Sequence, residues 1–172
     1  MLLGRGVCMS DRTRDVAADN RPRIVIRELS DSDRGRWDEL WQGYLEFYKC
    51  DLPPAATEIL WRRLRDSQDQ PYGLVAVQTA AAAANHVVGL VHYHFHLSTW
   101  SPAGYCYLED LYVDPTCRGA GAGRALIEAV YAAADRYGAT RVYWHTDNSN
   151  DRARTLYDKV GKLVPFVQYR RR

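Results

Sequence analysis

The sequence predicts an α/β (α+β) domain in which helices cover both faces of a mixed β-sheet. Two observations carry this prediction. Strand patterns at residues 73–78, 87–97 and 107–113 follow one another without a helix between them, which is typical of a meander. Helix and strand patterns then alternate to the end of the chain, which is typical of parallel neighbours. The expected order is strand, two helices, three strands, helix, strand, helix, strand.

The first half of the chain supplies one strand and two helices before the meander. Residues 23–29 alternate apolar and polar side chains, so they are predicted to form the first strand. Asp31, Ser32 and Asp33 offer capping side chains for the helix that follows. Its apolar residues recur at helical spacing: Trp37, Leu40, Trp41, Tyr44, Leu45 and Tyr48. A proline pair precedes a second helix at residues 57–65, and the alanine run at 80–84 is predicted to be a loop.

The second half contains the remaining elements. A turn at residues 98–104 precedes the strand at 107–113, which Pro115 stops because proline cannot donate to a ladder. A helical pattern starts at Arg124 and ends at Gly138, a typical residue after a helix. A strand is expected at 141–146, followed by a helix at 151–160 with Asn150 as its N-cap. Residues 163–169 are predicted to close the sheet as its last strand.

Length and composition are those of an ordinary globular protein. The 172 residues fit one domain, predicted at 21–172, after a polar extension at 1–20 that is expected to be disordered. A net charge of +2 gives no argument for nucleic acid, and no apolar run approaches the length needed to span a membrane. The four cysteines show neither metal nor disulfide spacing, so the cytoplasm is the expected location.

Three glycines stand between the strand at 107–113 and the next helix. Gly119, Gly121 and Gly123 leave backbone N–H groups uncovered at the positive end of a helix, which predicts a phosphate or pyrophosphate site. Their spacing does not match the dinucleotide fingerprint, and Gly123-Arg124-Ala125 does not match the P-loop. Three glycines alone would also fit a purely steric role in a turn.

The wider stretch resembles one family. Arg118-x-x-Gly121-x-Gly123, following Leu111-x-Val113-x-Pro115, is similar to the acetyl-CoA-binding motif of the GNAT N-acetyltransferases. The resemblance covers residues 23–170 and implies the GNAT fold, with acetyl-CoA as cofactor. It also implies a strand bulge that exposes backbone to the pantetheine arm, with the Val113 N–H meeting the thioester oxygen. The implied cofactor-binding residues are Leu111, Tyr112, Val113, Arg118, Gly119, Ala120, Gly121, Ala122, Gly123, Arg124 and Asn150.

Two residues are candidates for proton transfer. Glu109 and Asp110 are adjacent on a strand, so they are expected to point to opposite faces. The resemblance implies that Glu109 is the base that acts on the amine through water; the alternative is a solvated or ion-paired carboxylate. Tyr157, on the last helix after Asn150, is implied as the acid that protonates the leaving thiolate. Without the resemblance, a tyrosine on an amphipathic helix would be a core residue.

The acceptor site is less specific. The resemblance implies that the first helix and the loop after it wall the acceptor pocket, where aromatic rings can stack on a cationic amine. The implied substrate-binding residues are Tyr44, Phe47, Tyr48 and Asp110. The aromatic residues also fit a core stripe. His92, His94 and His96 alternate along one strand, but ligands at such steps diverge too far to close a metal site, so no metal is expected.

Residues 107–115, 142–146 and 164–170 together look like the Hpa-type branch of the family, named for enzymes that acetylate histone tails and polyamines. The predicted function is that of an acetyl-CoA-dependent N-acetyltransferase. A primary amine, on a polyamine-like small molecule or a lysine side chain, attacks the thioester directly. The alternative is a non-catalytic coenzyme-A-binding or interaction protein with the same fold. Members of this branch associate through the last strand, so a homodimer or higher homo-oligomer is expected.

Overall fold

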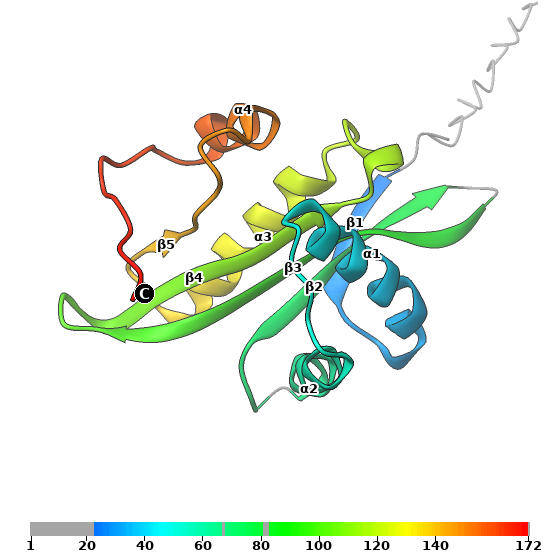
Figure 1. The fold of residues 1–172 in the computed structure, drawn as a ribbon, viewed down its shortest axis with the longest axis horizontal. Coiled ribbons are helices and arrows are strands. Elements are labelled where there is room, and N and C mark those ends of the chain that lie inside the picture. Colours follow the sequence, from blue (N-terminus) through cyan, green and yellow to red (C-terminus); the bar gives the residue numbers. More distant parts are fainter. Residues whose placement is uncertain (1–22, 67, 81–82, 172) are drawn as a thin grey trace, which may run out of the picture.

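The computed structural model describes residues 23–66, 68–80 and 83–171, which form one mixed five-stranded sheet with helices on both faces (Figure 1). The strands are β1 (Arg23–Glu28), β2 (Tyr72–Ala80), β3 (Ala83–Ser98), β4 (Ser101–Val113) and β5 (Val142–Tyr143). The helices are α1 (Arg34–Phe47), α2 (Pro54–Arg65), α3 (Ala122–Tyr137) and α4 (Asp151–Val160). In these ranges no helix is both long and apolar enough to cross a bilayer. The extension predicted at residues 1–20 lies outside the described residues.

The strands lie side by side in their chain order, β1-β2-β3-β4-β5. The first four are antiparallel to their neighbours, whereas β5 is parallel to β4 after the crossover through α3. The predicted mixed sheet is therefore confirmed. β2 and β3 are longer than predicted, because the ladder continues into the alanine-rich segment through the pair Ala80–Ala83.

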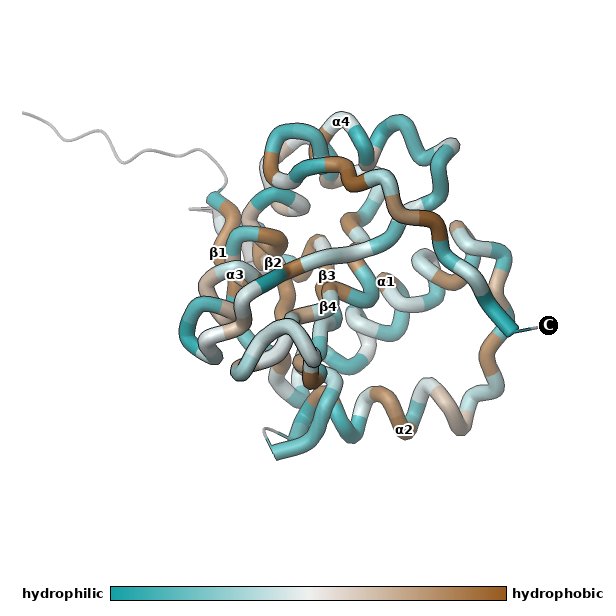
Figure 2. Tube along the Cα trace, turned by 90° about the vertical axis from the view of Figure 1, so that its left-hand side faces the viewer, coloured by the Kyte–Doolittle hydropathy of each residue, from teal (hydrophilic) through white to brown (hydrophobic). Residues whose placement is uncertain are grey.

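Two apolar clusters, one on each face of the sheet, hold the helices. α3 packs on one face, where Leu126 and Ile127 are fully buried against the strands. α1 and α2 cover the other face with Trp37, Trp41 and Trp61. Figure 2 shows the resulting layers, with apolar strands between α3 on one side and α1 on the other. Each large side chain that is fully buried in this way contributes about 1.5–3 kcal/mol.

The chain turns from β1 into α1 around the carboxylate of Asp33. This carboxylate accepts hydrogen bonds from the backbone N–H and hydroxyl of Ser30. It also accepts two from the guanidinium of Arg27, at 2.6 and 2.8 Å. These contacts, the bond from Arg27 first, lower the pKa of Asp33 to about 2. Asp33 stands at the N-cap position of α1, but its side chain reaches back to Ser30 and makes no cap hydrogen bond to that helix, so the predicted side-chain cap of α1 is not formed by Asp33.

A β-bulge interrupts β4 at Glu109. The register pairs are Tyr93–Leu108 and His92–Asp110 on the β3 side, and Cys106–Val142 and Tyr107–Tyr143 on the β5 side. Glu109 is therefore an extra residue opposite a single step of β3. Past Tyr107 β4 has no strand on its β5 side, so its edge is open in the described chain.

The last predicted strand does not form. Residues 161–171 follow α4 without joining a ladder, and Phe166, Val167 and Tyr169 are 82 %, 77 % and 91 % exposed. A strand exists only where a neighbour pairs its backbone groups, and none of the described strands pairs with this segment. β5 is shorter than predicted for the same reason, since only Val142 and Tyr143 pair with β4.

Candidate active site

The glycine loop between β4 and α3 has the geometry of an anion site. Gly119 and Gly121 have φ angles of 93° and 88°, which residues with a side chain rarely adopt. A Cβ at either position would meet no atom of the described residues within 4 Å, so the space beside both glycines is open. α3 begins at Ala122, two residues before the predicted start, because Gly121 is its N-cap. The first N–H groups of α3 have no partner within the helix and are free for a ligand.

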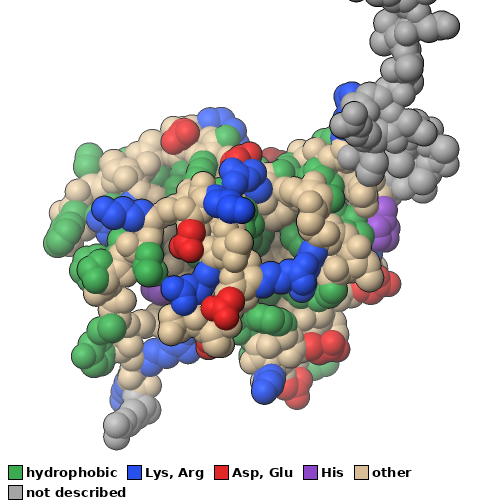
Figure 3. Space-filling model, turned by 90° about the horizontal axis from the view of Figure 1, so that it is seen from above, with side chains coloured by type: hydrophobic (Ala, Val, Ile, Leu, Met, Phe, Trp, Pro, Cys, Tyr) green, Lys and Arg blue, Asp and Glu red, His purple; other side chains and the backbone are tan. Residues whose placement is uncertain are grey.

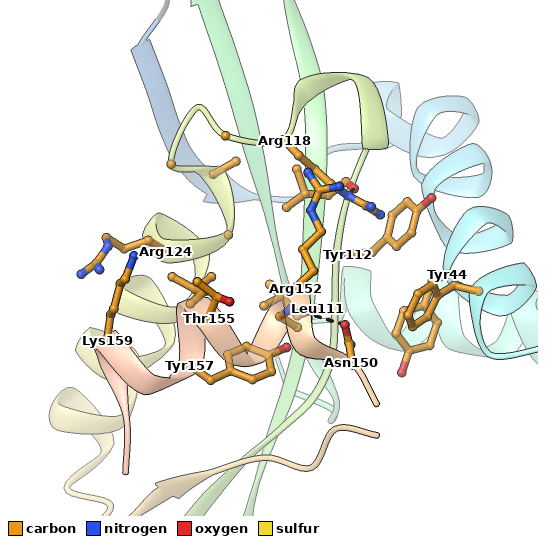
Figure 4. Close-up of a pocket in the computed structure, with 18 of the residues that line it drawn as sticks. Tyr44, Leu111, Tyr112, Arg118, Arg124, Asn150, Arg152, Thr155, Tyr157 and Lys159 are labelled. Atoms are coloured by element: carbon orange, nitrogen blue, oxygen red, sulfur yellow. Dashed lines mark hydrogen bonds between the residues drawn. The ribbon is translucent and has the colours of Figure 1, made fainter. Parts of the chain in front are cut away.

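A cavity of about 520 Å³ opens beside this loop, between β4, α3, α4 and the end of α1 (Figure 4). Its cationic lining residues are Arg118, Arg124, Arg152 and Lys159, and no carboxylate of the described chain lines it. Seen from above the fold, several Lys and Arg side chains lie on this face, with Asp and Glu side chains among them (Figure 3). Cations together with free backbone N–H groups suit a polyanion such as a pyrophosphate. This space is called the cofactor cavity below.

α4 contributes more to the cofactor cavity than the sequence analysis recognised. Arg152, Thr155 and Lys159 line it, and none of them was predicted. In Figure 4, Lys159 lies beside Arg124 of α3. The spacing of three and four residues places the α4 residues on one helix face, and that spacing is the signal that could have found them. Ala120, by contrast, was predicted to hold the cofactor but is exposed and does not line the cavity.

Beyond the bulge, the open edge of β4 presents backbone groups to the cofactor cavity. Leu111, Tyr112 and Val113 all line it. The Tyr112 carbonyl lies toward β3. Because backbone groups alternate along a strand, those of Leu111 and Val113 face the open edge. Arg118 occupies the Val113 carbonyl by donating to it from Nε at 2.9 Å. By the same alternation the Val113 N–H faces the cavity.

Asn150 joins α4 to the strand before it, at the rim of the cofactor cavity. Its Oδ1 accepts from the Ala153 N–H at 3.3 Å, and its Nδ2 donates to the Thr146 hydroxyl at 3.1 Å. The predicted N-cap is therefore confirmed. Asn150 sets the direction in which α4 leaves the strand, and with it the position of the residues that α4 contributes.

Tyr157 reaches into the cofactor cavity from α4, with its hydroxyl toward Asn150 and Leu111 (Figure 4). Its ring packs edge-on against Trp144, with the centroids 5.4 Å apart. Burial, and to a lesser degree the nearby Tyr48, raises the pKa of Tyr157 to about 12. The phenol is therefore protonated at neutral pH, as a general acid must be.

Glu109 lies in a different space, a second cavity of about 370 Å³ that is called the acidic cavity below. The lining residues are Leu60, Gln70, Pro71, His92, His94, Phe95, Glu109 and Asp110. The prediction that Glu109 and Asp110 point to opposite faces is wrong. Glu109 Oε2 lies 3.7 Å from Nδ1 of His94, and Asp110 Oδ2 lies 2.9 Å from Nδ1 of His92. Both carboxylates thus share one face, because the bulge shifts the alternation of β4 by one residue.

The pKa of Glu109 depends on the neighbouring Asp110. Burial first, and then the charge of Asp110, raises the pKa of Glu109. A raised pKa brings a carboxyl closer to the range in which it can both take up and release a proton. Burial and the neighbouring His96 lower the pKa of His94. No cluster of three or more His, Cys, Asp or Glu side chains in the described ranges could hold a metal ion.

Tyr44 stands between the two cavities. It lines the cofactor cavity, while the charge of Asp110, which lines the acidic cavity, acts on its hydroxyl. Burial, followed by the charge of Asp110, raises the pKa of Tyr44 far above that of an ordinary phenol. Phe47 and Tyr48 line the cofactor cavity at the same end and are about half exposed. The structure therefore brings three predicted acceptor residues, Tyr44, Phe47 and Tyr48, into the cavity of Tyr157, but it places the fourth, Asp110, in the other cavity with Glu109.

Comparison with known proteins agrees with this geometry. A family model described as "Acetyltransferase (GNAT) family" matches residues 36–161, a range that includes every residue of both cavities. The chain belongs to the GNAT acetyltransferase family. The five-stranded mixed sheet and the helices on both faces are those of a GNAT domain, as predicted.

Individual GNAT relatives are named as N-acetyltransferases. The chain is 38 % identical over 149 residues to the D-amino-acid N-acetyltransferase HPA3 of Saccharomyces cerevisiae, covering 87 % of this chain and 91 % of that protein. It is 37 % identical over 140 residues to the thialysine N-epsilon-acetyltransferase of Mus musculus, covering 79 % and 82 %. The structure of the ribosomal-protein-alanine N-acetyltransferase of Brucella melitensis biovar Abortus 2308 matches with a TM-score of 0.70 at 19 % identity, covering 87 % and 99 %. The expected resemblance to the Hpa-type branch is confirmed.

Proposed function

We propose that this GNAT protein transfers the acetyl group of acetyl-CoA to a primary amine, on a small cationic molecule or a lysine side chain, by direct attack of the amine. The observation that carries the proposal is the cofactor cavity. Its glycine loop and the start of α3 offer N–H groups for a pyrophosphate, and its four cations suit further phosphate oxygens. Its far end meets the open edge of β4, which suits an extended polar chain such as pantetheine.

Bound acetyl-CoA supplies the acetyl group as a thioester, and the residues of the chain handle charge and protons. The Val113 N–H faces the cavity, where it can donate to an oxygen on which negative charge develops. Glu109 takes up the amine proton through water, and its raised pKa suits that exchange. The Tyr157 hydroxyl holds a proton at neutral pH and passes it to the departing sulfur.

The acidic cavity favours an acceptor with positive charge. Glu109 and Asp110 line it, and no Lys or Arg of the described residues does. The names of the relatives refer to D-amino acids and to the side-chain amine of thialysine. A polyamine-like molecule or a peptidyl lysine presents a primary amine without a free carboxylate beside it. Such an acceptor suits a lining that offers carboxylates and no cation.

One observation favours a second candidate function, that of a non-catalytic coenzyme-A-binding or interaction protein. Glu109 and Tyr157 line separate cavities, so the two proton-transfer groups do not face one another across one space. Amine-dependent turnover with any acceptor would exclude this candidate.

Two measurements on the full chain test the proposal. Calorimetry is expected to show binding of acetyl-CoA, and a thiol-release assay is expected to show turnover with polyamines or lysine peptides. Thialysine and D-amino acids belong in the same panel because the relatives are named for them. Absence of acetyl-CoA binding would reject both candidates. Binding without amine-dependent release anywhere in the panel would leave the non-catalytic one.

We also propose that the protein works in the cytoplasm as a homodimer or larger homo-oligomer. The exposed apolar side chains of residues 163–169 support assembly, because they are left uncovered within one chain. The free thiols of Cys50, Cys106 and Cys117 are compatible with a reducing compartment.

A further inference from the structure

A chain of hydrogen bonds ties α1 to the sheet at the β4 bulge, and the mechanism proposed above does not use it. It starts at the indole of Trp37, which donates from Nε1 to Nε2 of His92 at 3.1 Å. Nδ1 of His92 lies 2.9 Å from Oδ2 of Asp110, and the charge of Asp110 also acts on the Tyr44 hydroxyl. Trp37 and Tyr44 are two turns apart on α1. Both residues therefore lie on one helix face, which Trp37 joins to the sheet through His92.

The geometry determines where the proton on His92 lies. An indole N–H can only donate, so Nε2 of His92 must offer its lone pair to Trp37. The ring proton then lies on Nδ1 and is donated to Asp110. An imidazolium would set a second N–H against that of Trp37. Since His92 is 1 % exposed, it has next to no contact with solvent. His92 is thus placed to accept from Trp37 at Nε2 and to donate to Asp110 from Nδ1.

This chain of hydrogen bonds acts directly on the bulge. Asp110 is the residue after Glu109, and its carboxylate is held by Nδ1 of His92, which Trp37 of α1 holds in turn. Holding Asp110 on the α1 side of the sheet leaves the extra residue, Glu109, on that side as well. Glu109 enters the acidic cavity there, next to His94.

We propose that His92 is a positioning residue for acetyl transfer: by donating from Nδ1 it holds Asp110, and through Asp110 it orients Glu109 in the acidic cavity. The inference rests on the proposed function, because it assigns His92 no substrate contact and no proton transfer of its own. Its effect is on geometry alone. A displacement of reacting groups by about 1 Å can cost roughly 10²-fold in rate.

Two substitutions of His92 separate positioning from simple core packing. The amide nitrogen of His92→Asn takes the place of Nδ1, so it keeps the donor to Asp110 and loses the acceptor for Trp37. The amide oxygen of His92→Gln takes the place of Nε2, so it keeps the acceptor and loses the donor. Each variant leaves one buried polar group unpaired, so both should lower the melting temperature, His92→Gln the more because the group it leaves unpaired is acidic.

Turnover should separate the two variants. With saturating acetyl-CoA and one amine, kcat is expected to fall roughly 10²-fold in His92→Gln, whereas His92→Asn keeps a much larger share. The Kd for acetyl-CoA should change far less in both, because the glycine loop is not touched. Equal kcat in the two variants, with an active parent, would overturn this inference alone. A parent without turnover on any amine would overturn the proposed function and this inference with it.

A measurement on the unaltered protein decides the same point even if neither variant folds. Nitrogen-15 NMR of the histidine rings at neutral pH is expected to show His92 as the Nδ1–H tautomer, with Nε2 unprotonated. An Nε2–H tautomer or an imidazolium would mean that His92 does not donate to Asp110 in the proposed way, and the inference would be wrong.

Discussion

Burial raises the pKa of both residues proposed to move protons, which makes Tyr157 a weaker acid and Glu109 a stronger base. It raises the pKa of Tyr157 to about 12, which keeps a proton on an acid. A phenol is a weak acid for a thiolate whose parent thiol has a pKa near 8.5. The same burial raises the pKa of a thiol that leaves within the cavity, so the difference between donor and acceptor narrows. For Glu109 burial weakens the acid and so strengthens the conjugate base.

Tyr157→Phe removes the hydroxyl and keeps the ring that packs against Trp144. We expect kcat to fall by about 10²–10⁴-fold, the usual contribution of a general acid, with little change in the Kd for acetyl-CoA. Tyr137→Phe is the matched control, because Tyr137 lies at the end of α3, half exposed and outside both cavity linings. Turnover equal to that of the parent in Tyr157→Phe would make Tyr157 a packing residue.

The pH dependence of kcat tests Glu109. A base works only when deprotonated, so turnover should decrease as the pH falls through the raised pKa of Glu109. Asp110→Asn removes the neighbouring negative charge that helps to raise this pKa, so the acidic limb should move to lower pH. Glu109→Gln should abolish the limb together with most of the rate. A limb that stays at the same pH in Asp110→Asn would mean that another group causes it.

At the scale of elements, the loop before α3 owes its anion site to backbone conformation. Gly121 and Gly138 have φ angles of 88° and 83°, and both have room for a Cβ. Gly121 opens α3 at the cofactor cavity, whereas Gly138 ends the same helix outside it. The two glycines thus lie at opposite ends of α3. A side chain would bring nearly the same backbone strain at both positions.

Alanine at either position should lower the free energy of unfolding by a similar amount, about 1–2 kcal/mol. Gly121→Ala alone should weaken acetyl-CoA binding, by about tenfold, which corresponds to ~1.4 kcal/mol. Thermal melts first check that the two variants are equally stable. Calorimetry then measures the difference between their Kd values for acetyl-CoA. If Gly138→Ala lost affinity equally, strain in α3 rather than contact with phosphate would be the cause.

The elements also show what could be predicted from sequence. The loop, α3 and the Asn150 cap depend on local signals, namely glycine spacing, helical periodicity and capping side chains, and they lie where those signals indicate. The bulge at Glu109 depends on how β4 pairs with β3, which no local pattern reveals. It reversed the expected facing of one carboxylate. The helical spacing of Arg152 and Lys159 places them on one face of α4, but no local pattern reveals that this face lies opposite the glycine loop.

At the scale of the whole molecule, the segment predicted as the last strand exposes its apolar side chains instead of pairing. Phe166 and Val167 are 82 % and 77 % exposed. Leu97 and Trp100, at the turn between β3 and β4, are equally exposed at 89 % and 82 %. The described chain therefore exposes large apolar side chains at both places, and the family resemblance connects only the last segment with assembly.

The proposed homo-oligomer is tested by changing each surface in turn. We expect light scattering to give at least the mass of a dimer for the parent, and that of a monomer for the double variant Phe166→Ser/Val167→Ser. Leu97→Ser/Trp100→Ser, the matched control, should keep the mass of the parent, because it removes as much exposed apolar area elsewhere. A monomeric parent at micromolar concentration would reject the assembly. Dissociation by the control pair alone would move the interface to the β3–β4 turn, and residues 163–169 would then need another explanation for their exposed side chains.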